Sequence, residues 1–195
     1  MASATEPPLR QRPIKRVEYE RLTEQGFFDS DERLELLDGL LVVREPQHAP
    51  HASAVRRAVR VLRAAFGPGW LVDSQLPIAL DDVSEPEPDV AVVPTDPADY
   101  REGHPARPVL IVEIADSSLA KDRGVKLALY ARAGITDYWI VNLIDRVVEA
   151  YREPVWSPSS PHGWRYASLV VARPGERVTP LAAPHSSVAA ADLLP

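Results

Sequence analysis

The sequence contains no cysteine, and this absence excludes disulfide bonds and metal sites built from thiolates. It also has no apolar run that approaches the roughly 20 residues needed by a membrane-spanning helix. The opening stretch MASATEPPLRQRPIKR lacks the apolar core that marks a secretory signal. We therefore expect a cytoplasmic protein with no membrane contact.

Positive charge is also in short supply. The formal net charge is −6 and the pI about 5.4, which is unlike a basic protein that coats nucleic acid non-specifically. This net charge is compatible with a nuclease, because metal-binding carboxylates make it more negative while local basic stripes can still hold phosphates. The chain has 195 residues, of which 45% are hydrophobic and 26% charged, as expected for one globular domain.

The first half of the chain alternates between short elements and turn signals. Residues 1–16 are rich in proline, arginine and small side chains, and we interpret them as a flexible arm before a single domain over 17–195. In RLELLDGLLVVRE, Asp38-Gly39 separates two apolar stretches, which predicts a β-hairpin with strands near 33–37 and 40–45. The stretch HASAVRRAVRVLRAAFG predicts an amphipathic helix, with arginines on one face at Arg56, Arg60 and Arg63.

The second half of the chain predicts further strands and one helix. A strand is expected near 89–93, and PVLIVEIA is a continuous apolar run typical of a strand buried on both faces. SSLAKDRGVKLALYARAG has helical period, DYWIVNLIDRVVEAYRE predicts a second hairpin, and WRYASLVVA with RVTPLAA predicts a third strand pair. This mixed order favours an α/β or α+β fold, with a mixed sheet flanked by helices.

Two acidic residues interrupt the predicted strands. Glu113 is the single polar side chain in VLIVEIA, and burial of an unpaired carboxylate is costly. Asp89 opens the strand that follows Pro88. Glu113 could pair with an arginine or face solvent, and Asp89 could be an acidic turn residue. On neighbouring strands, however, the two could share one Mg²⁺, which needs few protein carboxylates beside waters and phosphate oxygens.

Two other residues could complete such a site. Glu35 in the first predicted strand could join the two acids, or it could be an exposed strand residue. Lys126 lies in the helix after the strand of Glu113 and could position the attacking water. It could equally form an i,i+4 pair with Asp122, and the pattern alone leaves both interpretations open.

Several stretches resemble one protein family. EPEPDVAVVP and VLIVEIADSSLAKDRGVKLALYARAGITDYWIVN resemble the Uma-two family of restriction-endonuclease-like proteins. LELLDGLLV resembles the first hairpin of that family, and HASAVRRAVRVLRAAFG resembles its next helix, which opens with a histidine such as His51. The resemblance covers about residues 17–152. It implies the fold of PD-(D/E)XK nucleases, whose motif is an acid after proline on one strand and acid-x-Lys on the next.

The resemblance assigns this motif to particular positions. Pro88-Asp89 matches its first part and Glu113 the acid of its second part. Ala115 stands where the motif lysine is expected, which points to Lys126 in the following helix. The implied activity is hydrolysis of phosphodiester bonds in DNA, with Lys126 orienting the water or stabilising charge on phosphorus.

The same resemblance implies a cofactor and its ligands. Asp89, Glu113 and the carbonyl of Ile114 would hold Mg²⁺ or Mn²⁺. Glu35 would bind a second metal or a metal-bound water. Gln75 could line the site through its amide, although an ordinary strand position is an equal alternative.

Basic residues of the helix predicted in HASAVRRAVRVLRAAFG are candidates for contact with DNA. His51 is interpreted as a helix cap or a substrate contact rather than a metal ligand. Arg56, Arg60 and Arg63 could contact phosphates, or they could form an ordinary solvated helix face.

Three functions are open on this sequence. The leading one is a metal-dependent DNA endonuclease, and the alternative is a non-catalytic DNA-binding or assembly module on the same fold, favoured by the displaced lysine and the acidic net charge. A hydrolase of small phosphodiesters is the third, but the sequence has no phosphate loop to support it. A homodimer is expected if both DNA strands are cut, with strands near 147–152 or 166–172 as candidate contacts.

Overall fold

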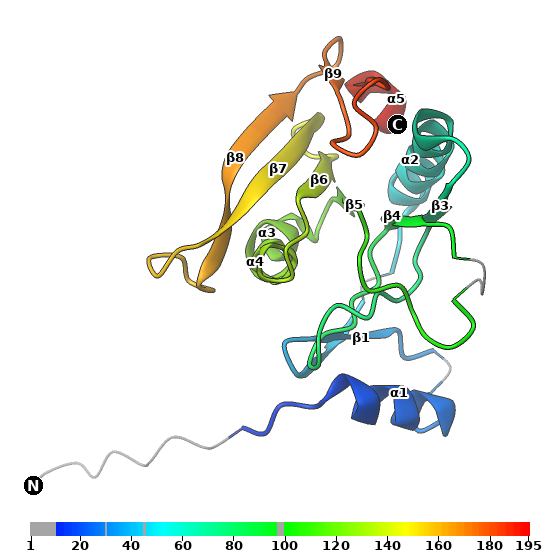
Figure 1. The fold of residues 1–195 in the computed structure, drawn as a ribbon, viewed down its shortest axis with the longest axis vertical. Coiled ribbons are helices and arrows are strands. Elements are labelled where there is room, and N and C mark those ends of the chain that lie inside the picture. The colour runs from blue at the N-terminus through cyan, green and yellow to red at the C-terminus, as the bar shows by residue number, and fades with distance from the viewer. Residues whose placement is uncertain (1–10, 30, 45, 97–99) are drawn as a thin grey trace, which may run out of the picture.

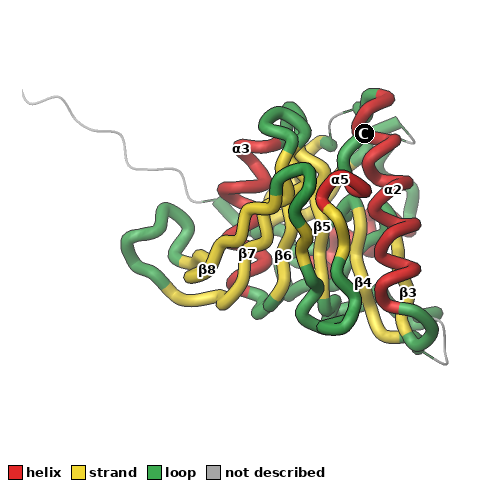
Figure 2. Tube along the Cα trace, turned by 90° about the horizontal axis from the view of Figure 1, so that it is seen from above, coloured by secondary structure: helices red, strands yellow, loops and turns green. Residues whose placement is uncertain are grey.

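A computed structural model describes residues 11–29, 31–44, 46–96 and 100–195 of the chain. Its centre is a six-stranded sheet with the order β3-β4-β5-β6-β7-β8, which Figure 2 shows from one edge to the other. Strands β5 and β6 run parallel, and the other neighbouring pairs are antiparallel. The mixed sheet predicted from the sequence is confirmed. The strands are β3 (Trp70–Asp73), β4 (Val90–Pro94), β5 (Leu110–Ala115), β6 (Asp137–Asn142), β7 (Val147–Trp156) and β8 (Trp164–Ala172).

A helical crossover joins the two parallel strands, as parallel pairing requires. After β5 the chain forms α3 (Leu119–Lys121), a π-helical turn (Asp122–Lys126) and α4 (Leu127–Arg132), and then enters β6. The sequence predicts one regular helix here. The structure differs in the middle turn, where the wider π-helical winding replaces the α-helical one.

Helices cover both faces of the sheet (Figure 1). On one face lie α2 (Ala49–Phe66) and α5 (Ala190–Leu193), and on the other lies α4. Because neighbouring strand residues point to opposite faces, Val112 and Ile114 pack with α2, whereas Ile111 and Ala115 pack with α4. All residues of β5 and β6 are buried, which confirms a strand covered on both faces. Within the described part of the chain, no helix is long and apolar enough to cross a bilayer.

The predicted hairpin is formed by β1 (Leu34–Leu37) and β2 (Leu40–Val43). Its turn residues Asp38 and Gly39 have φ angles of 51° and 79°, the two positive values of a type I′ turn. The Asp-Gly signal in the sequence therefore predicted both the hairpin and its turn correctly.

Backbone hydrogen bonds tie the hairpin to two other segments. Leu36 N donates to Glu85 O at 3.3 Å and Glu85 N to Leu36 O at 2.8 Å, which fixes β1 beside the segment that enters β4. Ile14 N donates to Gly39 O at 3.0 Å, directly before α1 (Arg16–Glu24). Of the predicted arm over residues 1–16, residues 1–10 lie outside the described residues.

The predicted third strand pair is wrong. β8 pairs with β7, while β9 (Arg177–Val178) pairs with β10 (Val188–Ala189) next to α5. β7 is ten residues long and offers β8 a full edge, whereas Gly175 turns the chain away from the sheet at a φ of 99°. The alternation of apolar residues identifies a strand, but it does not identify the strand with which it pairs.

The contact between the hairpin turn and the preceding segment generates a stability prediction. A Cβ on Gly39 would lie 2.4 Å from Cβ of Pro13, and its φ of 79° is unfavourable for alanine. Gly39→Ala is therefore expected to lower the free energy of unfolding by about 1–3 kcal/mol, measured by urea denaturation. Gly26→Ala is the control, because Gly26 has a φ of 66° with no atom within 4 Å of an added Cβ. Equal losses in both variants would contradict the predicted collision.

Candidate active site

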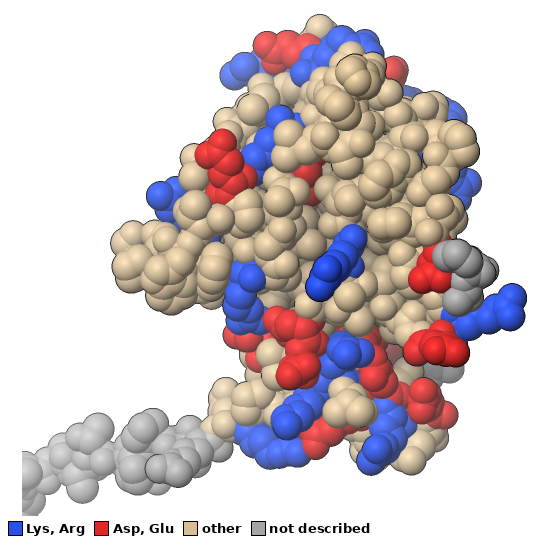
Figure 3. All heavy atoms as spheres, viewed as in Figure 1, with Lys and Arg blue, Asp and Glu red and all other residues tan. Residues whose placement is uncertain are grey.

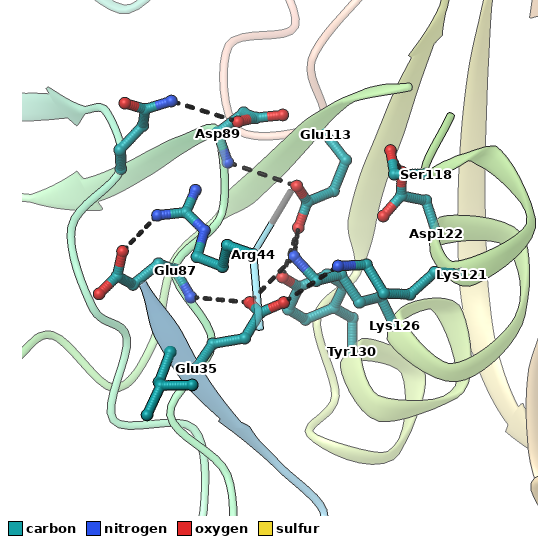
Figure 4. A network of polar contacts seen from close by, with 12 residues as sticks. Glu35, Arg44, Glu87, Asp89, Glu113, Ser118, Lys121, Asp122, Lys126 and Tyr130 are labelled. Carbon is teal, nitrogen blue, oxygen red and sulfur yellow. Dashed lines mark hydrogen bonds and ion pairs between the residues drawn. The ribbon is translucent and has the colours of Figure 1, made fainter. Parts of the chain in front are cut away.

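Three buried carboxylates from separate strand regions meet in one place (Figure 4). Glu35 comes from β1, Asp89 directly precedes β4, and Glu113 lies in β5, with exposed fractions of 0%, 5% and 3%. The β4–β5 register pairs Val90 with Val112, so the next step places Asp89 opposite Glu113. Asp89 N accordingly donates to Glu113 Oε2 at 3.4 Å. Strand pairing is thus sufficient to bring the two predicted motif acids together.

Asp89 is held by three neighbours. Its Oδ2 accepts hydrogen bonds from Ile114 N at 2.9 Å and contacts His51 Nε2 at 3.0 Å, and its Oδ1 faces Gln75 Nε2 at 3.5 Å. Gln75 adopts a left-handed φ of 57° at this position. Burial acts to raise the pKa of Asp89, but the hydrogen bond and charge of His51 lower it overall. Asp89 therefore remains ionised.

The pKa of Glu113 is shifted in the opposite direction from that of Asp89. Its Oε1 accepts hydrogen bonds from Lys126 Nζ at 3.0 Å and from the Tyr130 hydroxyl at 2.7 Å. Burial raises its pKa to about 7, since the charges of Asp122, Asp89 and Glu35 add to the effect and outweigh the attraction of Lys126. Both donors use the same oxygen, so Oε2 stays on the side of Asp89.

Lys126 reaches the cluster although it lies on a helix. Its Nζ is 3.0 Å from Glu113 Oε1 and 3.1 Å from Glu35 Oε2, and its residue is 3% exposed. Burial would lower the pKa of Lys126, but the charges of Glu113 and Glu35 raise it above the usual value. The same lysine and Lys121 lower the pKa of Glu35 against the effect of burial. The alternative of a simple pair with Asp122 does not describe these contacts.

The π-helical turn explains how two lysines reach one carboxylate. An α-helix advances about 100° per residue, so positions five apart point in different directions. In a π-helix the backbone bonds join residues i and i+5, which brings such positions to the same side. Lys121 Nζ accordingly lies 3.3 Å from Glu35 Oε1, while Lys126 holds Glu35 Oε2.

These residues surround a small pocket of about 60 Å³. That volume has room for on the order of four water molecules at about 15 Å³ each, and it is too small for a nucleobase. Its lining residues are Glu35, Arg44, Pro46, Gln47, His48, His51, Asp89, Glu113, Asp116, Ser117, Ser118, Lys121, Asp122 and Lys126.

The pocket carries an excess of negative charge. Four of its carboxylates are buried, including Asp122 at 2% exposure, whose pKa is raised by burial. Among the described residues, Lys126, Lys121 and a protonated His51 contact these acids, while Arg44 also acts on Glu35 but is shared with Glu87. A bound cation would offset this excess.

The donor set fits a hard cation with few protein ligands. Within residues 11–29, 31–44, 46–96 and 100–195, no group of three or more acidic or histidine side chains is arranged to hold a metal unaided. Asp89 and Glu113 are adjacent, and the N–H of Ile114 points to Asp89. A strand residue directs its N–H and C=O to the same side, so the Ile114 carbonyl faces that edge as well. Mg²⁺ commonly completes such a set with waters.

The structure separates the predicted substrate residues into two groups. His51 and Gln75 contact Asp89 at the pocket. The three arginines of α2 lie outside it, around a hollow of about 520 Å³ on the outer side of that helix: Arg56, Arg60 and Arg63.

Tyr130, which lies behind the pocket, and the lining residues Lys121, Asp122 and Arg44 make contacts at the site that were not predicted from the sequence. Tyr130 bonds Glu113, Lys121 bonds Glu35, Asp122 accepts a hydrogen bond from Ser118 at 2.6 Å, and Arg44 pairs with Glu87. The sequence holds a signal for two of them. Asp122 and Tyr130 stand four residues before and after Lys126, a spacing that places all three near one helix face.

The chain is similar to known proteins in sequence and in fold. A family model named Uma2, described as "Putative restriction endonuclease", matches residues 16–187. A crystal structure from Anabaena variabilis, described as a "putative nuclease belonging to DUF820", has a TM-score of 0.67 and 19% identity, over 93% of this chain and 97% of that one. At this identity the likeness shows the fold alone. No curated protein matches the chain.

Removal of the Lys126 ammonium tests how the cluster is held. Lys126→Met is expected to lower the free energy of unfolding of the metal-free protein by about 3–5 kcal/mol, because it leaves Glu113 and Glu35 buried without their cation. The pKa of Glu113 is raised to about 7, so its contribution to stability is present below its usual value of 4.5 and lost as pH rises through about 7. The loss should therefore be larger at about pH 8.5 than at about pH 5.5.

Lys121→Met is the matched control for this measurement. The Lys121 side chain is 29% exposed, so solvent screens its pair with Glu35. We expect a loss of less than about 1 kcal/mol in urea denaturation. Similar losses for the two variants at both pH values would contradict the assignment of Lys126 as the main cation of the cluster.

Proposed function

Since the chain belongs to the Uma2 family of restriction-endonuclease-like proteins, we propose that it is a metal-dependent endonuclease that hydrolyses phosphodiester bonds in DNA. One observation carries the proposal. Asp89, Glu113, Glu35 and Lys126, which come from four separate segments, are joined by contacts of 3.0 to 3.4 Å around one pocket. The open pocket beside these ion pairs supports a binding site over a purely structural cluster.

Asp89 and Glu113 are proposed to hold Mg²⁺ or Mn²⁺, together with the carbonyl of Ile114. Asp89 Oδ1 and Glu113 Oε2 have the longer protein contacts, at 3.5 and 3.4 Å, while Oδ2 and Oε1 accept the shorter hydrogen bonds, at 2.9 and 3.0 Å. When bound, the cation supplies positive charge to the phosphodiester oxygens and makes water a better nucleophile. Glu35 is proposed to bind a second cation or orient a water from the opposite wall.

The protein's own groups prepare this chemistry. Lys126 and Tyr130 fix Glu113 by hydrogen bonds to Oε1, and His51 and Ile114 fix Asp89 by contacts to Oδ2. Each acid is therefore held in one orientation before substrate arrives, which avoids reorganisation during the reaction. The small pocket is proposed to receive the phosphate, with the bases outside it.

The outer face of α2 is proposed to contact the DNA backbone. Arg56, Arg60 and Arg63 are exposed along this helix, whose first turn carries His51 at the pocket. Figure 3 shows that charges of both signs gather around α1 and the β1–β2 hairpin on its visible face, while much of the upper part is uncharged. A local arginine stripe is therefore a better candidate for phosphate contact than a uniformly basic face.

A non-catalytic DNA-binding or assembly module is the second candidate. It is favoured by the position of Lys126, which is buried and engaged by two carboxylates rather than directed at an open pocket. In this alternative the carboxylate cluster stabilises the fold, and the arginines of α2 make the main contact with DNA.

The proposal includes a cytoplasmic protein that acts as a homodimer, with residues 17–195 as one domain. Strand β8 is an edge of the sheet, and it exposes Leu169, Val170 and Val171 by 51%, 43% and 39%. An edge strand with apolar side chains offers backbone and side-chain contacts to a second copy.

Loss of either motif acid tests the nuclease activity. Asp89→Asn and Glu113→Gln are expected to reduce Mg²⁺- or Mn²⁺-dependent nicking of plasmid DNA by at least about 10–100-fold, the loss typical even for groups one shell outside a metal. The exposed Glu102→Gln serves as the control and should cleave like the wild type. EDTA should stop cleavage by the wild type. A pure wild-type protein that binds DNA in EDTA but cleaves no DNA form with any divalent metal would favour the non-catalytic alternative.

The salt dependence of DNA affinity tests the arginine stripe. A variant with glutamine at positions 56, 60 and 63 should bind DNA more weakly, and its slope of log affinity against log salt should fall by up to about 2.7, or about 0.9 for each lost phosphate contact. Fluorescence anisotropy in Ca²⁺ measures both quantities. Arg173→Gln, at an exposed position after β8, is the matched control. An unchanged slope in the triple variant would show that this face of α2 is only solvated.

A further inference from the structure

We propose that Lys121, and not Lys126, supplies the positive charge that contacts the phosphate being cleaved, while Lys126 acts as a positioning residue for the carboxylates. This inference rests on the proposed nuclease function. The sequence analysis assigns the catalytic lysine role to Lys126 alone. The inference divides this role between Lys121 and Lys126.

Lys126 is poorly placed to contact a phosphate. Its ammonium has three N–H donors, and two of them face Glu113 and Glu35 at 3.0 and 3.1 Å. Its side chain is 4% exposed. A turn of Lys126 towards substrate would leave two buried carboxylates without their cation, which is strongly destabilising. Its contacts therefore fit a group that fixes Glu113 and Glu35.

Lys121 has the opposite properties. Its side chain is 29% exposed and lines the same pocket. Among the described residues, the one hydrogen bond of its ammonium is to Glu35 Oε1 at 3.3 Å. Within the described part of the chain, two of its three donors are thus available to an incoming phosphate oxygen, and Glu35 keeps the ammonium at the pocket (Figure 4).

Arg44 is the other permanently charged cation among the described pocket residues, and it is already engaged. Its guanidinium pairs with Glu87, and its side chain is 9% exposed. A guanidinium is also wide and planar, whereas an ammonium is a compact point charge that suits a small pocket. Lys121 is thus the better placed of the two for a phosphate.

The composition of the chain agrees with this choice. Of its 22 lysine and arginine residues three are lysines, Lys15, Lys121 and Lys126. Two of the three meet at one pocket through the π-helical turn. A chain that uses arginine for nearly every other cation has lysine at both positions where a compact charge is required.

Lys121 acts by charge and transfers no proton in the proposed step. A water oxygen forms a new bond to phosphorus, and the bond from phosphorus to the leaving ester oxygen breaks. One water proton is lost to solvent and the leaving oxygen gains a proton, so the products are a phosphate monoester and a hydroxyl group. The extra negative charge that develops on the phosphate oxygens is where a nearby ammonium stabilises the transition state.

The test compares Lys121→Gln, Lys121→Arg and Lys126→Gln with the wild type, with the exposed Lys15→Gln as the matched lysine control. Thermal melting first establishes that each variant is folded. Lys121→Gln should keep its melting temperature and lose on the order of 10²-fold in the cleavage rate constant, with partial recovery in Lys121→Arg. Lys15→Gln should equal the wild type.

A second readout does not depend on turnover. The bond cut by the wild type is mapped, and a duplex is made with an uncharged methylphosphonate at that bond. Affinity is then measured by fluorescence anisotropy with Ca²⁺. The neutral linkage should weaken binding by the wild type and by Lys126→Gln several-fold. It should weaken binding by Lys121→Gln clearly less, because only the contact with the bound cation is then lost.

The outcomes separate the inference from the function on which it rests. If Lys121→Gln cleaves like the wild type, or is weakened by the neutral linkage as much as the wild type, the assignment of Lys121 is overturned and the nuclease function stands. If the wild type itself cleaves no DNA, the nuclease function fails, and the inference fails with it. Loss of methylphosphonate sensitivity in Lys126→Gln instead would return the phosphate contact to Lys126.

Discussion

The ion pair that Lys126 makes with Glu113 and Glu35 is the contact on which the pocket depends. The three residues belong to the crossover helix, to β5 and to the β1–β2 hairpin, which are far apart in the sequence. All three side chains are removed from water, so none could stay ionised there without the others. The hairpin forms a two-stranded sheet of its own, and this buried charge, together with its bridge to Glu85, keeps it over the site.

One lysine cannot neutralise the carboxylates gathered around it. Asp89 is kept ionised by His51, whereas the pKa values of Glu113 and Asp122 are raised by burial among other acids. Such a cluster is costly unless a further positive charge enters. The unbalanced negative charge therefore favours a cation site. Its effect is greatest at Glu113, the acid that contacts both Asp89 and Lys126.

The sequence predicted the parts of this site that follow from strand period and turn chemistry. Asp38-Gly39 predicted the hairpin, and the polar interruption at Glu113 predicted an acid inside a buried strand. It did not predict Lys121 beside Glu35, because an α-helical period places Lys121 and Lys126 on different sides. The π-helical turn changes that relation, and it has no reliable signature in one sequence. The partner of β8 was also not predicted, because strand pairing depends on which strand edges are available in the folded sheet.

The position of the lysine on a helix also has a physical reason in the packing of β5. Ala115, two residues after Glu113, is fully buried with Tyr130 and Tyr138 against α4, so a lysine side chain has no room there. The crossover helix must then supply the cation, and with it come Asp122 and Tyr130 at the same spacing and Lys121 through the wider turn. A single lysine on the strand would have to fix the carboxylates and contact the phosphate from one position. A helix that presents two lysines can hold one inside the carboxylate cluster and leave the other at the entrance, where the phosphate of the proposed substrate would arrive.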